Sequence, residues 1–236
     1  MRPGGSPQRR IRPPVHLIRA TDQYGRVIRA TADLLTRLRL DHLFVGSVAR
    51  AAHSGEPIES GSIDVVATMG PQQKNQLAMM AANNGFTVER DEVDAAEELD
   101  LVPMRFESTR VHILVASNAL YGRMVADGVE AVFRGGGRPR PPTRGVEPRV
   151  PRGRADEDVR PHDQDVTLKV PRLEDFALLL QLNNDVESLM GLIESPAFDR
   201  ASYNAKLTAI GLRGLVVPDR VIPSREDGEG SPESKP

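Results

Sequence analysis

Two short apolar segments are each joined to polar residues that could bind a phosphorylated ligand. Residues 43–45 run directly into Gly46 and Ser47, and residues 62–66 carry Asp64 as their one acidic side chain. A glycine-serine turn at the start of a helix can bind phosphate through its backbone N–H groups. Carboxylates on a neighbouring strand can hold the Mg²⁺ ions that accompany a nucleoside triphosphate. The pattern therefore indicates a triphosphate-binding turn beside an incomplete set of carboxylates.

The elements around this turn follow from the spacing of apolar residues and from glycine and proline breaks. Residues 24–38 show helical spacing, and residues 70–71 are a Gly-Pro break. Gly85 is expected to end a helix, because glycine readily adopts the left-handed conformation of a C-terminal cap. In this half of the chain we expect helices over residues 24–38, 47–52 and 72–82, and strands over residues 43–45, 63–68 and 86–88.

The second half of the chain contains further helices and strands around a polar insertion. We expect helices over residues 91–99, 118–133, 171–182, 185–193 and 198–210, with an irregularity at Asp127-Gly128, and strands over residues 101–107, 110–116 and 166–170. The pattern predicts an α+β fold, in which a small mixed sheet is flanked by helices and followed by a C-terminal helical unit.

Five parts make up the expected domain organisation. They are a disordered N-terminal arm (1–23), a mixed α/β domain (24–133), a disordered insertion (134–165), a C-terminal strand and helical unit (166–217) and a disordered tail (218–236). The insertion is rich in Arg, Pro and Gly and has few large apolar residues, so it cannot bury enough surface to offset the entropy of ordering.

Composition excludes several classes of protein. The 236 residues are 39% hydrophobic with a net charge of −2, so the chain can bury a sizeable core and has no overall field that attracts it to nucleic acid or membranes. It has no cysteine, which excludes disulfides and thiolate chemistry. No apolar run approaches the roughly 18 residues of a membrane span. We therefore expect a cytoplasmic protein with neither a membrane partner nor a DNA partner.

Taken in order, these motifs resemble the nucleotidyltransferase superfamily of DNA polymerase beta. More narrowly, they are similar to the bacterial AbiEii-like toxin and antitoxin nucleotidyltransferases. The resemblance rests on residues 44–49, on His53 with the Gly-Glu-Pro of residues 55–57, on residues 63–66 and on residues 170–175. It covers roughly residues 24–212 without the insertion. It implies a nucleotidyltransferase-like fold, an NTP and Mg²⁺.

The resemblance implies two Mg²⁺ ions held by an Asp-x-Asp pair and by a third aspartate on a neighbouring strand. The first aspartate of the pair falls on Ser62 and the third on His112, so that Asp64 alone keeps its carboxylate. Neither a neutral hydroxyl nor an imidazole replaces a carboxylate as a ligand for Mg²⁺. Ile58 and Ser60 stand where the family has an arginine and a threonine, and a lysine of the family is replaced within residues 178–180.

We therefore expect a degenerate, non-catalytic nucleotidyltransferase that binds a nucleotide or a macromolecular partner. Gly46 and Ser47 would contact the nucleotide, and Asp64, Ser62 and His112 would occupy the vestigial catalytic positions.

Two alternatives remain open. In the first, an active enzyme uses Asp64, helped by Glu107 or another carboxylate, to hold Mg²⁺ while an NMP passes from an NTP to a protein or tRNA hydroxyl. In the second, arginines between residues 134 and 154 bind RNA phosphates, and binding weakens steeply with salt.

Each candidate site residue also has a structural interpretation. Ser47 could cap a helix, Asp64 could hydrogen-bond neighbouring backbone at a strand end, and His112 could be a satisfied histidine on a partly buried strand. The acidic residues between 91 and 100 are expected to form a solvated helix face.

Overall fold

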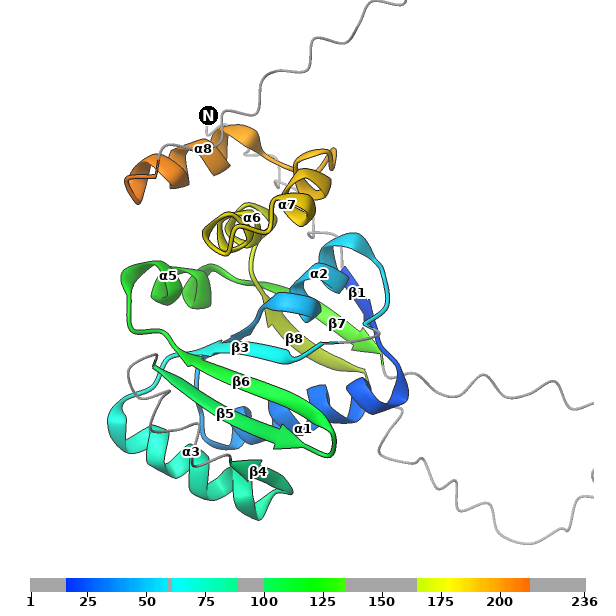
Figure 1. Ribbon diagram of the computed structural model, residues 1–236, viewed down its shortest axis with the longest axis vertical. Coiled ribbons are helices and arrows are strands. Elements are labelled where there is room, and N and C mark those ends of the chain that lie inside the picture. Colours follow the sequence, from blue (N-terminus) through cyan, green and yellow to red (C-terminus); the bar gives the residue numbers. More distant parts are fainter. Residues whose placement is uncertain (1–15, 59–60, 89–99, 135–164, 213–236) are drawn as a thin grey trace, which may run out of the picture.

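The computed structural model describes residues 16–58, 61–88, 100–134 and 165–212 and has an α+β fold, as the sequence predicts (Figure 1). Its helices are α1 (Asp22–Arg37), α2 (Gly46–Ser54), α3 (Pro71–Asn83), α5 (Ala119–Asp127), α6 (Leu173–Leu182), α7 (Val186–Ile193) and α8 (Arg200–Ala209). Its strands are β1 (His16–Arg19), β2 (His42–Phe44), β3 (Ile63–Ala67), β4 (Phe86–Val88), β5 (Leu101–Phe106), β6 (Thr109–Val115), β7 (Val129–Arg134) and β8 (Val166–Val170).

The described strands form two sheets. The five-stranded sheet has the order β2-β3-β6-β5-β4 and is mixed, because β3 and β6 are parallel while the other neighbours are antiparallel. The three-stranded sheet has the order β1-β7-β8, with β1 parallel and β8 antiparallel to β7. The parallel pair β3-β6 is what brings the candidate site residues together.

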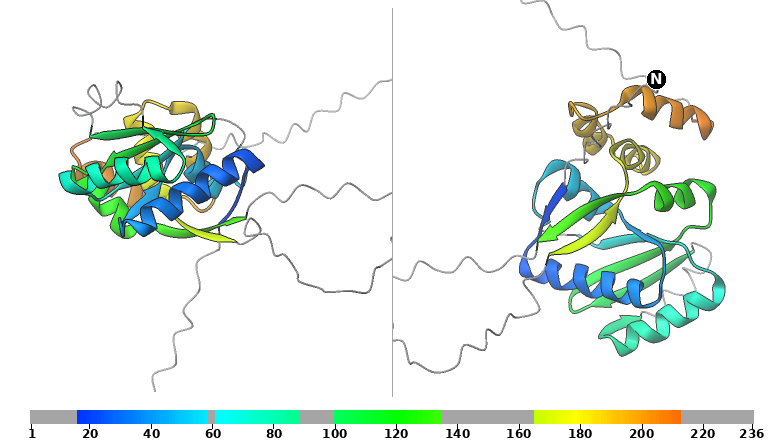
Figure 2. Two further views of the ribbon diagram at one scale, coloured as in Figure 1. Left: turned by 90° about the horizontal axis from the view of Figure 1, so that it is seen from below. Right: turned by 180° about the vertical axis from the view of Figure 1, so that it is seen from behind.

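Two groups of buried apolar side chains hold the helices on these sheets. One group joins alternate residues of the five-stranded sheet, such as Val65, to Leu35 of α1 and to α3. The other joins Val66 to Met124 of α5 and to Phe176 of α6. Because side chains alternate along a strand, the two groups lie on opposite faces of β3. The helices α6, α7 and α8 lie at the end of the molecule away from α3 (Figures 1 and 2).

Most of the expected elements are present with bounds shifted by one or two residues. Gly85 follows Asn84, the C-cap residue of α3, and its φ of +85° confirms its expected left-handed conformation. The expected helix over residues 91–99 and most of the expected insertion lie outside the described residues.

The N-terminal region differs from the expected disordered arm of residues 1–23. Residues 16–19 form β1, which pairs in parallel with β7, and α1 begins at Asp22. Ile18 is fully buried in the core. The arm prediction is therefore wrong for residues 16–23, because the Arg- and Pro-rich composition before them conceals a strand whose partner lies more than 100 residues away in the sequence.

The expected helix over residues 118–133 is also wrong in its second half. Helix α5 ends at Asp127, and residues 129–134 form β7. At the junction, a Cβ on Gly128 would lie only 2.5 Å from Leu43 Cδ1, so the chain approaches β2 closely as it changes direction. Val132 and Phe133 are β-formers, and β7 pairs with strands on both sides.

Strand β8 is present as expected but does not belong with the helices that follow it. It pairs with β7 and completes the three-stranded sheet, so it belongs with the elements of the N-terminal half. At the edge of the expected insertion, Arg134 Nη2 lies 3.2 Å from Asp165 Oδ2. This ion pair joins the end of β7 to the residue before β8.

Candidate functional site

Asp64 and His112 lie side by side on the two parallel strands of the five-stranded sheet. β3 and β6 pair in a register that places Asp64 opposite His112. Both side chains are partly exposed, whereas their neighbours Ile63, Val65 and Val111 are buried on the opposite face. Side chains alternate between the two faces of a strand. The register of β3 with β6 therefore places Asp64 and His112 next to each other on the face opposite to Ile63, Val65 and Val111.

The carboxylate of Asp64 accepts hydrogen bonds on both of its oxygens. His112 Nδ1 donates to Oδ1 over 2.8 Å, and Ser62 Oγ lies 2.9 Å from Oδ1 and 3.0 Å from Oδ2. The two residues that the resemblance aligns with the first and third aspartates, Ser62 and His112, thus both bind Asp64. The structural interpretation of Asp64 is a hydrogen bond to neighbouring backbone. The hydrogen bonds to its carboxylate come instead from the side chains of Ser62 and His112.

Gly46 lies directly against this carboxylate. Its φ is +56°, and a Cβ at this position would lie 2.6 Å from Asp64 Oδ2. The backbone N–H of Val45 donates to the Asp64 carbonyl over 2.9 Å, which fixes the turn beside β3. Only glycine satisfies both the left-handed conformation and the close approach.

Ser47 fixes the same turn to the residue before β3. Its Oγ donates to the Ser62 carbonyl over 3.0 Å. The N-cap of α2 is Val45, and no side chain caps this helix end. The capping interpretation of Ser47 is therefore wrong, because its hydroxyl links α2 to the neighbouring segment instead.

The donor set around Asp64 does not fit the two Mg²⁺ ions that the resemblance implies. Mg²⁺ in proteins is held by carboxylates and substrate phosphates, and here one carboxylate is surrounded by a hydroxyl and an imidazole that donate to it. Within the part of the chain that the structure describes, no group of three or more His, Cys, Asp or Glu side chains is arranged to hold a metal ion.

Glu107, the carboxylate that could have helped Asp64, points elsewhere. It lies in the turn between β5 and β6 and accepts hydrogen bonds from Arg26 Nε and Nη2 over 3.1 and 2.8 Å. This hydrogen bond is the main reason that the pKa of the Glu107 carboxyl is lowered. Glu107 lies beyond the last pair of the hairpin, Phe106 with Thr109, whereas His112 is three residues further along β6, about 10 Å from that end. Glu107 therefore does not complete a metal site with Asp64.

A groove extends from the Gly46-Ser47 turn along α2 toward α6 and α7. It consists of two adjoining cavities of about 430 and 670 Å³, which share six lining residues. The first cavity is lined by Gly46 and Ser47 at the start of α2 and by Phe176 and Leu180 of α6. The second continues beside α7 to Leu192. Its size is suitable for a small-molecule ligand or for a segment of a partner.

One ion pair crosses the groove. Arg50 Nη2 of α2 lies 3.0 Å from Oδ2 of Asp185, the N-cap residue of α7. The other oxygen of Asp185 accepts the backbone N–H of Ser188 over 3.2 Å. Hydrogen bonding from Ser188, together with Arg50, lowers the pKa of the Asp185 carboxyl. The ion pair therefore joins the two walls of the groove.

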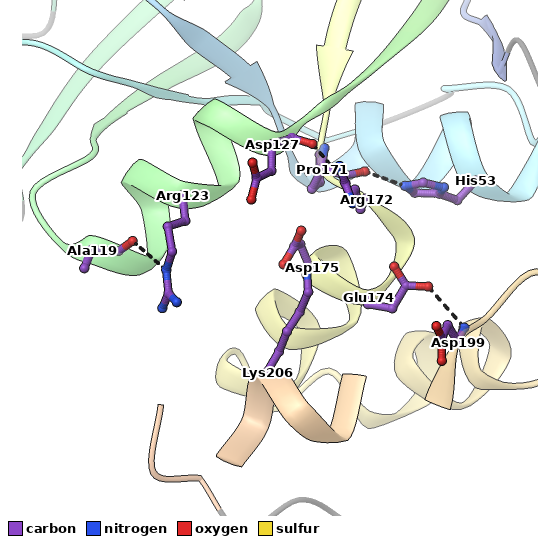
Figure 3. A network of polar contacts seen from close by, with 10 residues as sticks. All are labelled: His53, Ala119, Arg123, Asp127, Pro171, Arg172, Glu174, Asp175, Asp199 and Lys206. Atoms are coloured by element: carbon purple, nitrogen blue, oxygen red, sulfur yellow. Dashed lines mark hydrogen bonds and ion pairs between the residues drawn. The ribbon is translucent and has the colours of Figure 1, made fainter. Parts of the chain in front are cut away.

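Polar contacts hold the C-terminal helices together and against α2 (Figure 3). His53 Nε2 of α2 donates to the Pro171 carbonyl over 2.9 Å. Asp175 of α6 is buried and is paired with Lys206 of α8. These contacts position α6, which forms the floor of the groove.

A comparison of the sequence with models of known protein families finds no match, and a comparison with curated proteins likewise finds none. None of the described helices is both long enough and apolar enough to cross a membrane.

Sequence reasoning identified five residues that the structure brings together: Gly46, Ser47, Ser62, Asp64 and His112. It missed the groove beside them. Arg50 could have been suspected, because it lies one helical turn after Gly46 and Ser47. Asp185 carries no such signal, since it is 135 residues away from Arg50 in the sequence.

Proposed function

We propose that this chain is a degenerate nucleotidyltransferase-like protein that binds a nucleotide or a macromolecular partner and does not carry out two-metal catalysis. The observation that carries the proposal is the hydrogen bonding of the Asp64 carboxylate: Oδ1 accepts from His112 Nδ1, and the Ser62 hydroxyl lies within hydrogen-bond distance of both oxygens.

Two-metal catalysis needs carboxylates that coordinate two cations and stabilise both the attacking and the leaving oxygen. A cation at Asp64 would displace the donors Ser62 and His112 and gain no second carboxylate in exchange. If the metals supply several kcal/mol of transition-state stabilisation, their loss slows the reaction by orders of magnitude, at about 1.4 kcal/mol per tenfold.

The binding part of the proposal is supported by the features that do not depend on metals. The turn at Gly46 and Ser47 keeps its glycine conformation and its contact with β3. It opens into a groove that is large enough for a nucleotide or for a polypeptide segment. A role in a bacterial toxin-antitoxin pair is a proposal that the resemblance alone supports. A cytoplasmic location is a proposal that rests on the composition of the sequence, which has no cysteine.

The test is incubation of the protein with each α-labelled nucleoside triphosphate, Mg²⁺ or Mn²⁺, and protein or tRNA acceptors. We expect no labelled acceptor with the native chain. Thermal stabilisation by a nucleotide, measured in the same buffers, would support the binder. Transfer that is abolished by Asp64→Asn would refute the proposal and establish the active enzyme, which moves an NMP to a hydroxyl.

A further inference from the structure

The first cavity of the groove has one candidate partner for phosphate charge among its described lining side chains. Arg50 is the sole lysine or arginine there, and it lies on the same wall as Gly46 and Ser47. Because the donor set at Asp64 does not fit Mg²⁺, a polyphosphate in this cavity would depend on Arg50 for charge compensation. Guanidinium groups bind phosphate oxygens through two parallel hydrogen bonds.

Arg50 is already engaged by Asp185, which lines the same cavity. Glu56 adds a second carboxylate to the lining. With the ion pair formed, Asp185 offsets the charge of Arg50, and the carboxylate of Glu56 has no compensating cation among the described lining residues. The cavity then repels an anion within the Debye length of about 8 Å. A polyphosphate therefore gains the full charge of Arg50 only by taking it away from Asp185.

We propose that Asp185 is a specificity-determining residue of the groove, which competes with the phosphates of a nucleotide for the guanidinium of Arg50. The inference rests on the proposed function, since it concerns the nucleotide as the ligand of the same groove. Asp185 is then an internal competitor that favours ligands with enough phosphate charge to displace it. Nucleotide binding is thereby coupled to the link between α2 and α7.

The effect of Asp185 on the dissociation constant of a nucleotide is expected to be modest but measurable, because the pair with Arg50 is exposed. The side chains of Arg50 and Asp185 are 51% and 35% exposed, so the pair is easily broken. Removal of the competing carboxylate should tighten binding about fivefold, the equivalent of about 1 kcal/mol. Asp185→Asn is the suitable variant, because asparagine is as good an N-cap as aspartate and keeps the start of α7 intact.

The experiment measures the dissociation constants of ATP, CTP, GTP, UTP and inorganic triphosphate by calorimetry, with a chelator present to remove divalent ions. We expect Asp185→Asn to bind a triphosphate about fivefold more tightly than the native chain. Arg50→Gln should weaken binding about tenfold or more, because it removes a hydrogen-bonded charge. In the double variant, which carries Arg50→Gln and Asp185→Asn, the gain in affinity from Asp185→Asn should largely disappear, because there is no guanidinium for which Asp185 could compete.

Glu107→Gln is the matched control. It removes the pair between Arg26 and Glu107, whose side chains are 49% and 44% exposed, without touching the groove. Its triphosphate affinity should equal that of the native chain. Equal gains from Asp185→Asn with and without Arg50, an equal gain from Glu107→Gln, or no gain at all would each overturn the inference.

The two proposals fail in different ways. Triphosphate binding that does not respond to Asp185→Asn overturns the competition and leaves the nucleotide binder standing. If no triphosphate binds to the native chain or to any variant, the competition is overturned. The nucleotide is then excluded as the ligand, and only binding of a macromolecular partner is left of the proposed function. Labelled transfer in the earlier assay refutes the non-catalytic assignment independently.

Discussion

Gly46 is the residue on which the geometry of the site depends most directly. It combines a left-handed backbone with a close approach to the Asp64 carboxylate. A side chain at this position would strain the turn and push Asp64 away from Ser62 and His112.

Gly46→Ala should therefore lower the free energy of unfolding by about 2 kcal/mol or more, since a non-glycine residue in this conformation costs about 1–3 kcal/mol before the collision is counted. Urea denaturation measures the change. Gly122→Ala is the matched control, because a Cβ at Gly122, within α5, would meet nothing within 4 Å. That variant should be neutral or more stable by up to about 1 kcal/mol. Equal destabilisation of both variants would argue against the close approach.

His42 predicts a dependence of stability on pH. It lies at the start of β2, where its Nδ1 donates to the Leu40 carbonyl over 2.8 Å, and its burial lowers its pKa. The unfolded chain therefore takes up a proton at a higher pH than the folded chain does. Because stability rises with pH wherever the unfolded state binds more protons, this contribution is present above the ordinary histidine pKa of 6.5 and is lost as the pH falls below it.

The expected result is a decrease in the free energy of unfolding of the native chain between pH 7.5 and pH 5, measured by urea denaturation at several pH values. His42→Asn keeps a side-chain N–H near the Leu40 carbonyl and removes the titrating ring, so its stability should decrease less over the same range. Parallel decreases in the two proteins would show that other groups cause the effect.

At the scale of elements, β1 connects the N-terminal region to the core. Ile18→Ala should cost about 2–5 kcal/mol, as large-to-small substitutions in a core do. Arg19→Ala, at an exposed neighbouring position, should change stability by no more than about 0.5 kcal/mol. Thermal or urea denaturation of the two variants measures these changes in the free energy of unfolding. An equally small effect of Ile18→Ala would contradict the pairing of β1 with β7.

How far the sequence predicts the elements depends on how local their signals are. The helix α3 and its glycine cap follow from a Gly-Pro break and from Gly85, both of which act within a few residues. β1 was missed because its partner β7 lies more than 100 residues away in the sequence. β7 was missed because both of its partners, β1 and β8, are distant in the sequence. A short strand with little alternation carries no local signal that distinguishes it from a linker or from the end of a helix.

The same distinction applies to the candidate site. The proximity of Ser62 to Asp64 follows from the two-residue period of a strand. The place of His112 beside them depends on the parallel pairing of β3 and β6, which only the resemblance to a known fold could suggest. The pair between Arg50 and Asp185 depends on where α6 and the start of α7 lie relative to α2, and no pattern of spacing contains that information.

At the scale of the whole molecule, α2 and the C-terminal helices α6 and α7 line a groove next to a site with one carboxylate. This site does not bind a pair of divalent cations, because Ser62 and His112 occupy positions where carboxylates would be needed. Cation binding can be measured without knowledge of the nucleotide or of the acceptor.

The most direct measurement is a titration of the native chain with Mn²⁺, followed by electron paramagnetic resonance of the free ion. It should be compared with the double variant Ser62→Asp and His112→Asp, which restores the two missing carboxylates. The account predicts no saturable site in the native chain at millimolar Mn²⁺ and a saturable site in the double variant that Asp64→Asn removes. One or two Mn²⁺ ions bound to the native chain and lost on Asp64→Asn would contradict it.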